Sequence, residues 1–96
     1  MRISLKKYAP VISSDEVADE VFNLITSSLS KDEEIVLDFS EIRIISTKCA
    51  KRIFGQLYGI LGPESFFSRI IFENASENIR PSLNDGIESF LLDNKS

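Results

Sequence analysis

Residues 33–61 contain the pattern that most constrains the fold: a short apolar run, then a polar turn, then a helical repeat. The run at 34–39, EIVLDF, is rich in β-branched residues and is typical of a strand covered on both faces. Five apolar residues then recur at helical spacing: Ala50, Ile53, Phe54, Leu57 and Leu61. Gly62-Pro63 predicts the end of that helix. The chain therefore places a buried strand directly before an amphipathic helix.

Similar patterns on both sides extend this unit to a β-α-β-α-β-α order. Residues 2–8 and 69–73 read as strands, and Val11-Ile12 as a short extension of the first. Ser13, three residues before Glu16, has the spacing of a capping box and predicts a first helix, followed by a loop at 26–34. A last helix is predicted from Ser76, with a kink or a later start near Pro81. We expect a single small α/β domain over 1–96, with helices packed on a mainly parallel or mixed sheet.

The composition is that of an ordinary globular domain. Of the 96 residues, 43% are hydrophobic and 27% are charged, and no apolar run is long enough to span a membrane. The first ten residues lack the apolar core of a secretory signal. The single cysteine excludes an internal disulfide and fits a reducing compartment, so we expect a cytoplasmic protein without membrane insertion. The net charge of −4 argues against nucleic-acid binding.

The residues that most enzymes need are missing. The chain has no histidine, and its four glycines lack the spacing of a phosphate-binding loop. We therefore predict a non-enzymatic protein without a cofactor. Two further interpretations remain open. Cys49, beside Lys48 near a helix start, could be a reactive thiol or a small packing residue. Asp38 and Glu73 end two predicted strands, so they could hold Mg²⁺, or Asp38 could bond to the turn that follows it.

The turn before the second helix carries the strongest signal for a site. Arg43, Lys48, Lys51 and Arg52 are the only charged residues between Ile42 and Pro63. Basic side chains in early helical turns oppose the helix dipole, so something other than helix stability selects them, and a solvated helix face is the alternative. Unpaired N–H groups at a helix start favour anions. Ser46 and Thr47 add hydroxyls there; one is expected to cap the helix, and either is a candidate for phosphorylation.

Two glycines interrupt the predicted second helix. Gly55 and Gly59 share a stripe with Lys48 and Arg52, and a glycine inside a helix costs about 1 kcal/mol relative to alanine. A close approach of another backbone would explain that cost. The approaching backbone could belong to a docked partner or to another part of the same fold.

Several of these residues resemble the central strand–turn–helix of STAS domains, and more closely a divergent STAS-like family of small proteins. The matching residues are Leu37-Asp38-Phe39, Ile45-Ser46-Thr47, Ala50 and Phe54-Gly55. A weaker likeness continues through 69–74 and the last helix, so that the resemblance covers 33–91. The resemblance implies a partner-binding module, often regulated by phosphorylation, that docks through this turn and helix. Lys48 stands where anti-sigma-factor antagonists have their phosphorylated serine, so that switch does not transfer to this position.

We therefore expect a partner-binding site at Arg43, Ser46, Thr47, Lys48, Lys51, Arg52 and Gly55. The resemblance implies a regulatory partner, which the basic residues predict to have an acidic surface, in the class of histidine-kinase-like ATPases or anti-sigma factors. The alternative is a small-anion or nucleotide-binding module at 46–52.

Overall fold

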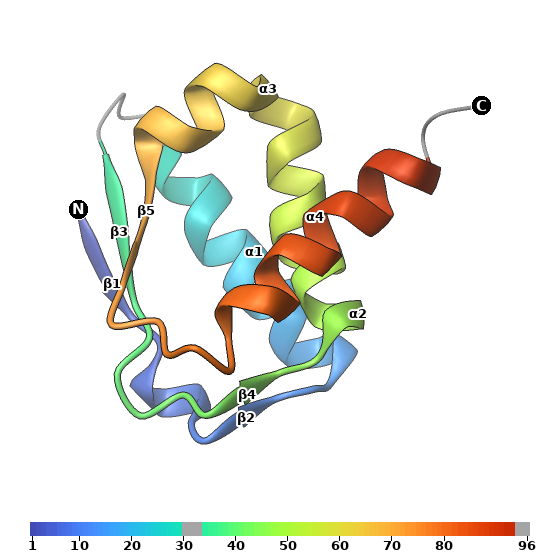
Figure 1. Ribbon diagram of the computed structural model, residues 1–96. Coiled ribbons are helices and arrows are strands. Elements are labelled where there is room, and N and C mark those ends of the chain that lie inside the picture. Colours follow the sequence, from blue (N-terminus) through green and yellow to red (C-terminus); the bar gives the residue numbers. More distant parts are fainter. Residues whose placement is uncertain (30–33, 94–96) are drawn as a thin grey trace.

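The computed structural model describes residues 1–29 and 34–93. The chain runs β1, η1, β2, α1, β3, β4, α2, η2, α3, β5 and α4, where η1 is a 3₁₀ turn and η2 a π-helical segment (Figure 1). No helix within these residues is both long and apolar enough to cross a membrane. The bounds of the strands and helices are β1 Arg2–Ser4, η1 Lys6–Tyr8, β2 Val11–Ile12, α1 Asp15–Leu29, β3 Ile35–Asp38, β4 Ile44–Ile45, α2 Thr47–Ala50, η2 Lys51–Gly55, α3 Gln56–Arg69, β5 Ile70–Glu73 and α4 Arg80–Asp93.

The main sheet has three parallel strands in the order β1-β3-β5. Leu37 of β3 lies between Ile3 of β1 and Phe72 of β5. Helical crossovers between successive strands produce this parallel arrangement. A second, smaller sheet pairs β2 with β4, also in parallel. The predicted α/β architecture is confirmed, and β3 is the central strand.

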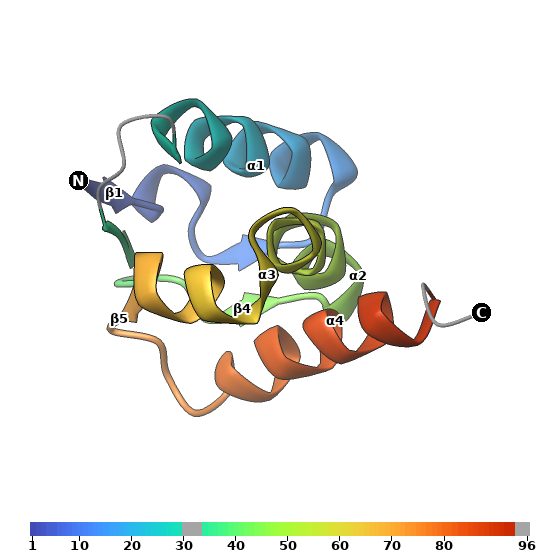
Figure 2. The ribbon, with the colours of Figure 1, turned by 90° about the horizontal axis from the view of Figure 1, so that it is seen from above.

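The helices cover only one face of the main sheet, and Figure 2 shows all of them on the same side of it. Ile35 and Leu37 point into the core and are fully buried, whereas Val36 and Asp38 alternate with them and are only partly covered. The prediction that β3 is covered on both faces is therefore wrong. Residues 35–37 are all apolar, but the strand has one buried face and one partly exposed face. Val36 lies on the partly exposed face, next to its partner Arg2 in β1.

A long helical stretch from α2 through η2 into α3 lies between α1 and α4 (Figure 2). It supplies much of the core, because Ile53, Phe54 and Leu57 are fully buried. The Phe54 ring stands edge-on to Phe72 of β5 at 5.2 Å and lies 6.3 Å from Phe39. Aromatic pairs of this geometry stabilise a core beyond the area that they bury. The helix that follows the predicted turn is thus the centre of the helical layer.

Helix boundaries differ from the predictions in places that local chemistry explains. Ser14, not Ser13, caps α1, since its Oγ accepts a hydrogen bond from Val17 N at 3.2 Å. The first residues of the predicted 26–34 loop belong to α1, and residues 30–33 lie outside the described part of the chain. The last helix begins at Arg80, so Pro81 falls in its first turn, where a missing N–H does no harm.

The predicted stop at Gly62-Pro63 is a sharp change of direction. Gly62 adopts φ 82° and ψ 163°, a conformation almost reserved for glycine, and Pro63 then begins a second helical segment that reaches Arg69. From the sequence, these residues are expected to lie between a helix and a strand. They form the far half of α3 in Figure 1 and place Phe66 in the core.

Candidate functional site

The predicted turn is a strand-to-helix junction in the structure. Ser46 follows β4 in extended conformation and caps the helix, because its Oγ accepts a hydrogen bond from Cys49 N at 3.1 Å. Thr47 is the first helical residue, and it is exposed. The Cys49 thiol is fully buried and lies 3.5 Å from the Ser14 carbonyl oxygen. Cys49 is therefore a packing residue, and a reagent in solution does not reach its sulfur.

The acidic first turns of α1 face two of the predicted basic residues. Arg52 binds Asp19 through two hydrogen bonds, Nε to Oδ1 at 2.6 Å and a terminal nitrogen to Oδ2 at 3.0 Å. Lys48 Nζ lies 3.3 Å from Asp15 Oδ1. The hydrogen bonds from Arg52 lower the pKa of Asp19, and those with Asp19 raise the pKa of Arg52. Much of the expected positive charge is therefore compensated by carboxylates of the same chain.

The other two basic residues, Lys51 and Arg43, differ in whether they form an ion pair. Lys51 forms an ion pair with Asp93 near the end of α4. Arg43 is exposed just before β4, and no carboxylate within residues 1–29 or 34–93 forms an ion pair with it. The bases of the second helix therefore connect it to the helices on either side. These ion pairs explain why basic residues occupy the first turns of a helix, where the helix dipole normally favours acidic residues.

Gly55 lies inside the fold. A Cβ atom at this position would meet Phe90 Cβ of α4 at 2.5 Å, so only glycine allows the two helices to approach this closely. Gly59 faces the edge of the same ring. The prediction of a partner-binding Gly55 is therefore corrected: α4 of the same chain covers this residue, and a partner cannot reach it.

The carboxylates of Asp38 and Glu73, at the ends of β3 and β5, are held by hydrogen-bond donors and by the charge of Arg2. Asp38 Oδ1 accepts from Ser40 N at 2.9 Å, Ser40 Oγ at 2.6 Å and Asn74 Nδ2 at 3.0 Å. Arg2 lies 3.2 Å from Asp38 Oδ2 and also pairs with Glu73. Hydrogen bonds from Asn74 and Ser40, together with the charge of Arg2, hold the pKa of Asp38 well below its usual range. A metal ion would have to displace these donors, so the cluster fits a structural role.

An exposed apolar pair, which was not among the predicted site residues, lies beside the turn. Val11 and Ile44 are directly paired neighbours of β2 and β4, and they are 44% and 54% exposed. Their neighbours Ile12 and Ile45 are likewise paired, but they point into the core. Successive residues of a strand face opposite sides, so the adjacent apolar pairs Val11-Ile12 and Ile44-Ile45 each expose one member when only one face of the strand is covered.

These observations define a surface that we call the β2–β4 face: Val11, Arg43, Ile44, Thr47 and Lys48. Figure 1 shows β2 and β4 side by side at one end of the molecule, where they lead into α1 and α2. Backbone hydrogen bonds from Arg43 N to Pro10 O at 2.8 Å and from Ser46 N to Ile12 O at 2.9 Å fix the two strands. Exposed apolar and basic residues therefore lie close together along these two strands and the start of α2.

Comparison with protein families agrees with this architecture. A family described as a STAS-like domain of unknown function (DUF4325) matches residues 17–80. The chain belongs to this family. The match begins at the third residue of α1 and runs through the central strand β3, the strand-to-helix turn and β5 to the first residue of α4. No curated protein and no solved structure matches the chain. The STAS-like resemblance of the turn and the second helix is thus confirmed.

Proposed function

We propose that this STAS-like domain is a non-enzymatic binding module that docks a regulatory protein through the β2–β4 face. The observation that carries the proposal is the paired exposure of Val11 and Ile44 on a short parallel ladder. Exposed apolar residues that gather in one place are a frequent mark of a protein contact, whereas scattered ones are ordinary. Here two lie side by side, next to the turn that the family resemblance implies for docking.

The charge of this face favours an acidic surface on the partner. Arg43 precedes Ile44 in the chain, is exposed and carries the charge that a partner can reach, whereas Lys48 already contacts Asp15. A carboxylate on the partner beside an apolar side chain would match this arrangement, and charge complementarity would orient the two proteins. The resemblance to anti-sigma-factor antagonists makes a histidine-kinase-like ATPase or an anti-sigma factor the expected class.

Thr47 is the better of the two hydroxyls for regulation by phosphorylation. Ser46 Oγ already accepts the hydrogen bond that caps the helix, whereas Thr47 is exposed at the first helical position. A phosphate there would add negative charge to the face and would lie near the positive end of the helix dipole. Modification of Thr47 would therefore oppose an acidic partner without disturbing the helix.

The alternative, a small-anion or nucleotide site at 46–52, has less support. Three bases of this segment are already paired with Asp15, Asp19 or Asp93. An anion would need to compete with these carboxylates. Titration of the protein with phosphate and with a nucleotide, followed by NMR, separates the two functions. We expect no saturable shifts; saturable shifts at residues 46–52 would favour the anion site.

Affinity capture from the native cell extract tests the docking face directly. Ile44→Asp places a charge in the middle of the face, so the protein that wild type captures should be lost. Leu24→Asp is the matched control, because Leu24 of α1 is 40% exposed and lies outside the β2–β4 face. Both variants should keep the wild-type circular dichroism spectrum. Equal recovery of the same protein by wild type and Ile44→Asp would contradict the proposal.

A further inference from the structure

The outer edge of β5 has no partner strand among the residues that the structure describes. β5 is the last strand of the main sheet, on the side nearest to α4 (Figure 2). Backbone groups of successive residues point to opposite sides of a strand, and the Glu73 carbonyl faces β3, where it accepts a hydrogen bond from Phe39 N at 2.9 Å. The N–H and the C=O of Phe72 therefore point away from the sheet. Such groups at a sheet edge are a template for another strand.

A pocket lies beside this edge, between β5 and the first turns of α4. Its lining residues are Phe72, Ala75, Arg80, Leu83 and Asn84, and its volume is about 130 Å³. Small-molecule sites typically measure roughly 300–1,000 Å³, so this pocket suits one side chain rather than a cofactor. Because Phe72 belongs to both the pocket and the edge, a strand added to β5 would pass directly over the pocket.

The lining of this pocket combines apolar groups with one positive charge. The Phe72 ring packs against Phe54 at 5.2 Å, and Leu83 is buried. Arg80 is exposed, and its Nε donates to the Ala75 carbonyl oxygen at 3.3 Å. In the described part of the chain no carboxylate forms an ion pair with Arg80. Its terminal nitrogens are therefore open to a carboxylate of another molecule.

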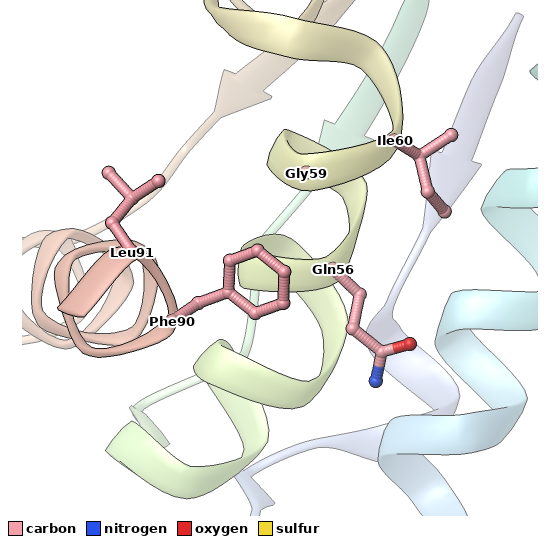
Figure 3. A pocket seen from close by; sticks show the side chains of 5 residues that line it. All are labelled: Gln56, Gly59, Ile60, Phe90 and Leu91. Carbon is pink, nitrogen blue, oxygen red and sulfur yellow. The ribbon is translucent and has the colours of Figure 1, made fainter. Parts of the chain in front are cut away.

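A larger hollow between α3 and α4 lacks these features. Figure 3 shows the Phe90 ring against the helix at Gly59, with Leu91 and Ile60 on either side. All of its lining residues lie on helices and none of them is charged: Gln56, Gly59, Ile60, Phe90 and Leu91. The pocket beside β5, in contrast, defines a hydrogen-bond pattern, an apolar contact and a charge for its occupant.

We propose that the outer edge of β5 and the pocket beside it bind an extended peptide segment of another protein, which adds to the sheet as a further strand. Hydrogen bonds to the backbone of Phe72 hold the segment, and its alternate side chains select it. The side chain next to Phe72 is apolar and enters the pocket. The next side chain on the same face, two residues away, is acidic and reaches Arg80, which lies beside Ala75 just past the end of β5.

The segment carries one acidic residue at this place rather than an acidic run. The chain has a net charge of −4, and the exposed Glu77 lies in the loop that leads to α4, so further carboxylates would be repelled. The site shares no residue with the β2–β4 face. A segment bound at β5 therefore leaves that face accessible.

NMR titration of the 96-residue chain with synthetic peptides tests the proposal. The peptides are capped, about seven residues long and built of threonine around a central leucine and one aspartate. The aspartate stands two residues after the leucine in one peptide and two before it in the other, because an added strand can run in either direction. We expect one of them to give saturable shifts at the Phe72, Leu83 and Asn84 amides, with a dissociation constant at or below about 1 mM.

Arg80→Glu should raise that dissociation constant at least about tenfold, and it should instead bind the peptide that has lysine in place of aspartate. Glutamate suits the first turn of α4, so this variant should fold. Arg43→Glu is the matched control, because Arg43 is also exposed and forms no ion pair within the described residues. It should bind the aspartate peptide like wild type.

The backbone contact has a test of its own. Two forms of the bound peptide, each methylated at alternate backbone nitrogens, differ only in which edge of the peptide loses its donors. The form methylated on the edge that faces β5 should lose binding, and the other form should keep it.

Four results would overturn the inference. The first is the absence of saturable shifts with both peptides up to about 1 mM. The second is equal affinity of wild type and Arg80→Glu, and the third is equal affinity of the two methylated forms. The fourth is a set of shifts confined to Arg2 and Ser4 of β1, which would place strand addition at the opposite edge of the sheet. None of these results bears on docking at the β2–β4 face, which rests on other residues.

Discussion

At the scale of single residues, glycine decides how closely α4 approaches the long central helix. A Cβ at Gly86 would meet Lys51 N at 2.5 Å and the Ala50 carbonyl carbon at 2.6 Å, both of them backbone atoms. A Cβ at Gly59 would meet only the far edge of the Phe90 ring. Backbone cannot move without moving a helix, whereas a half-buried ring can turn. The two glycines should therefore respond very differently to alanine.

Gly86→Ala should lower the free energy of unfolding by ~1–3 kcal/mol, because overpacking outweighs the better helix propensity of alanine. Gly59→Ala is the matched control and should stay close to wild type, since a gain of up to about 1 kcal/mol in propensity offsets the shift of the ring. Urea unfolding followed by circular dichroism measures both. A Gly86→Ala protein as stable as wild type would show that α4 does not pack against Ala50 and Lys51 as described.

Asp38 should make stability depend on acid pH. Its pKa in the folded protein lies below the unfolded value of about 4, so the carboxylate stabilises the fold above that pH and the stabilisation is lost as pH falls further. Asp38→Asn should therefore be less stable than wild type at pH 7, and the difference should shrink in acid. Asp85→Asn on the exposed face of α4 is the control. A difference that is constant with pH would contradict the described network around Asp38.

At the scale of elements, ion pairs connect the central helix to its neighbours, and this changes the expected result of charge reversal. From the sequence, replacing Lys48, Lys51 and Arg52 by glutamate would leave folding intact, since acids suit early helical turns. In the structure those positions face Asp15, Asp19 and Asp93, so three new glutamates would meet carboxylates of the same chain. We now expect the triple variant to be destabilised.

The pair of Arg52 and Asp19 allows a cleaner test. Arg52→Glu should lower the melting temperature, and more so at low salt, because repulsion between exposed charges is screened by ions. Asp19→Arg combined with Arg52→Glu reverses the pair and should recover much of the loss. A double-mutant cycle measures this coupling. No recovery in the double variant would mean that the two side chains do not interact in solution.

Several elements could be predicted from the sequence because local chemistry determines them. One of the two hydroxyls expected to cap the second helix, that of Ser46, does so, and the run at 35–38 is a strand. Val11-Ile12 is also a strand, but it pairs with β4 in a second sheet and does not extend β1 as expected. The segment from Pro63 to Arg69 could not be predicted in this way, because Gly62-Pro63 is equally typical of a helix end and of a turn into a new helix. Only the packing of Phe66 in the core decides between them.

At the scale of the whole molecule, the sequence left the site incomplete because burial depends on contacts between distant residues. Gly55 has the same local pattern whether a partner or α4 covers it, and only the fold places Phe90 against it. The basic residues likewise look unpaired until α1 and α4 supply their acids. What remains accessible is a smaller surface than the sequence suggested, centred on Ile44 rather than on Gly55.

The most direct test of this account is photo-crosslinking in the native cell. A photo-reactive phenylalanine analogue at position 44 should link the protein to one specific partner, and adding Arg43→Glu should weaken that link. The same analogue at position 24, which is also exposed but lies on α1, should give no such product. No partner linked from position 44, or the same partner linked equally from position 24, would contradict docking through the β2–β4 face.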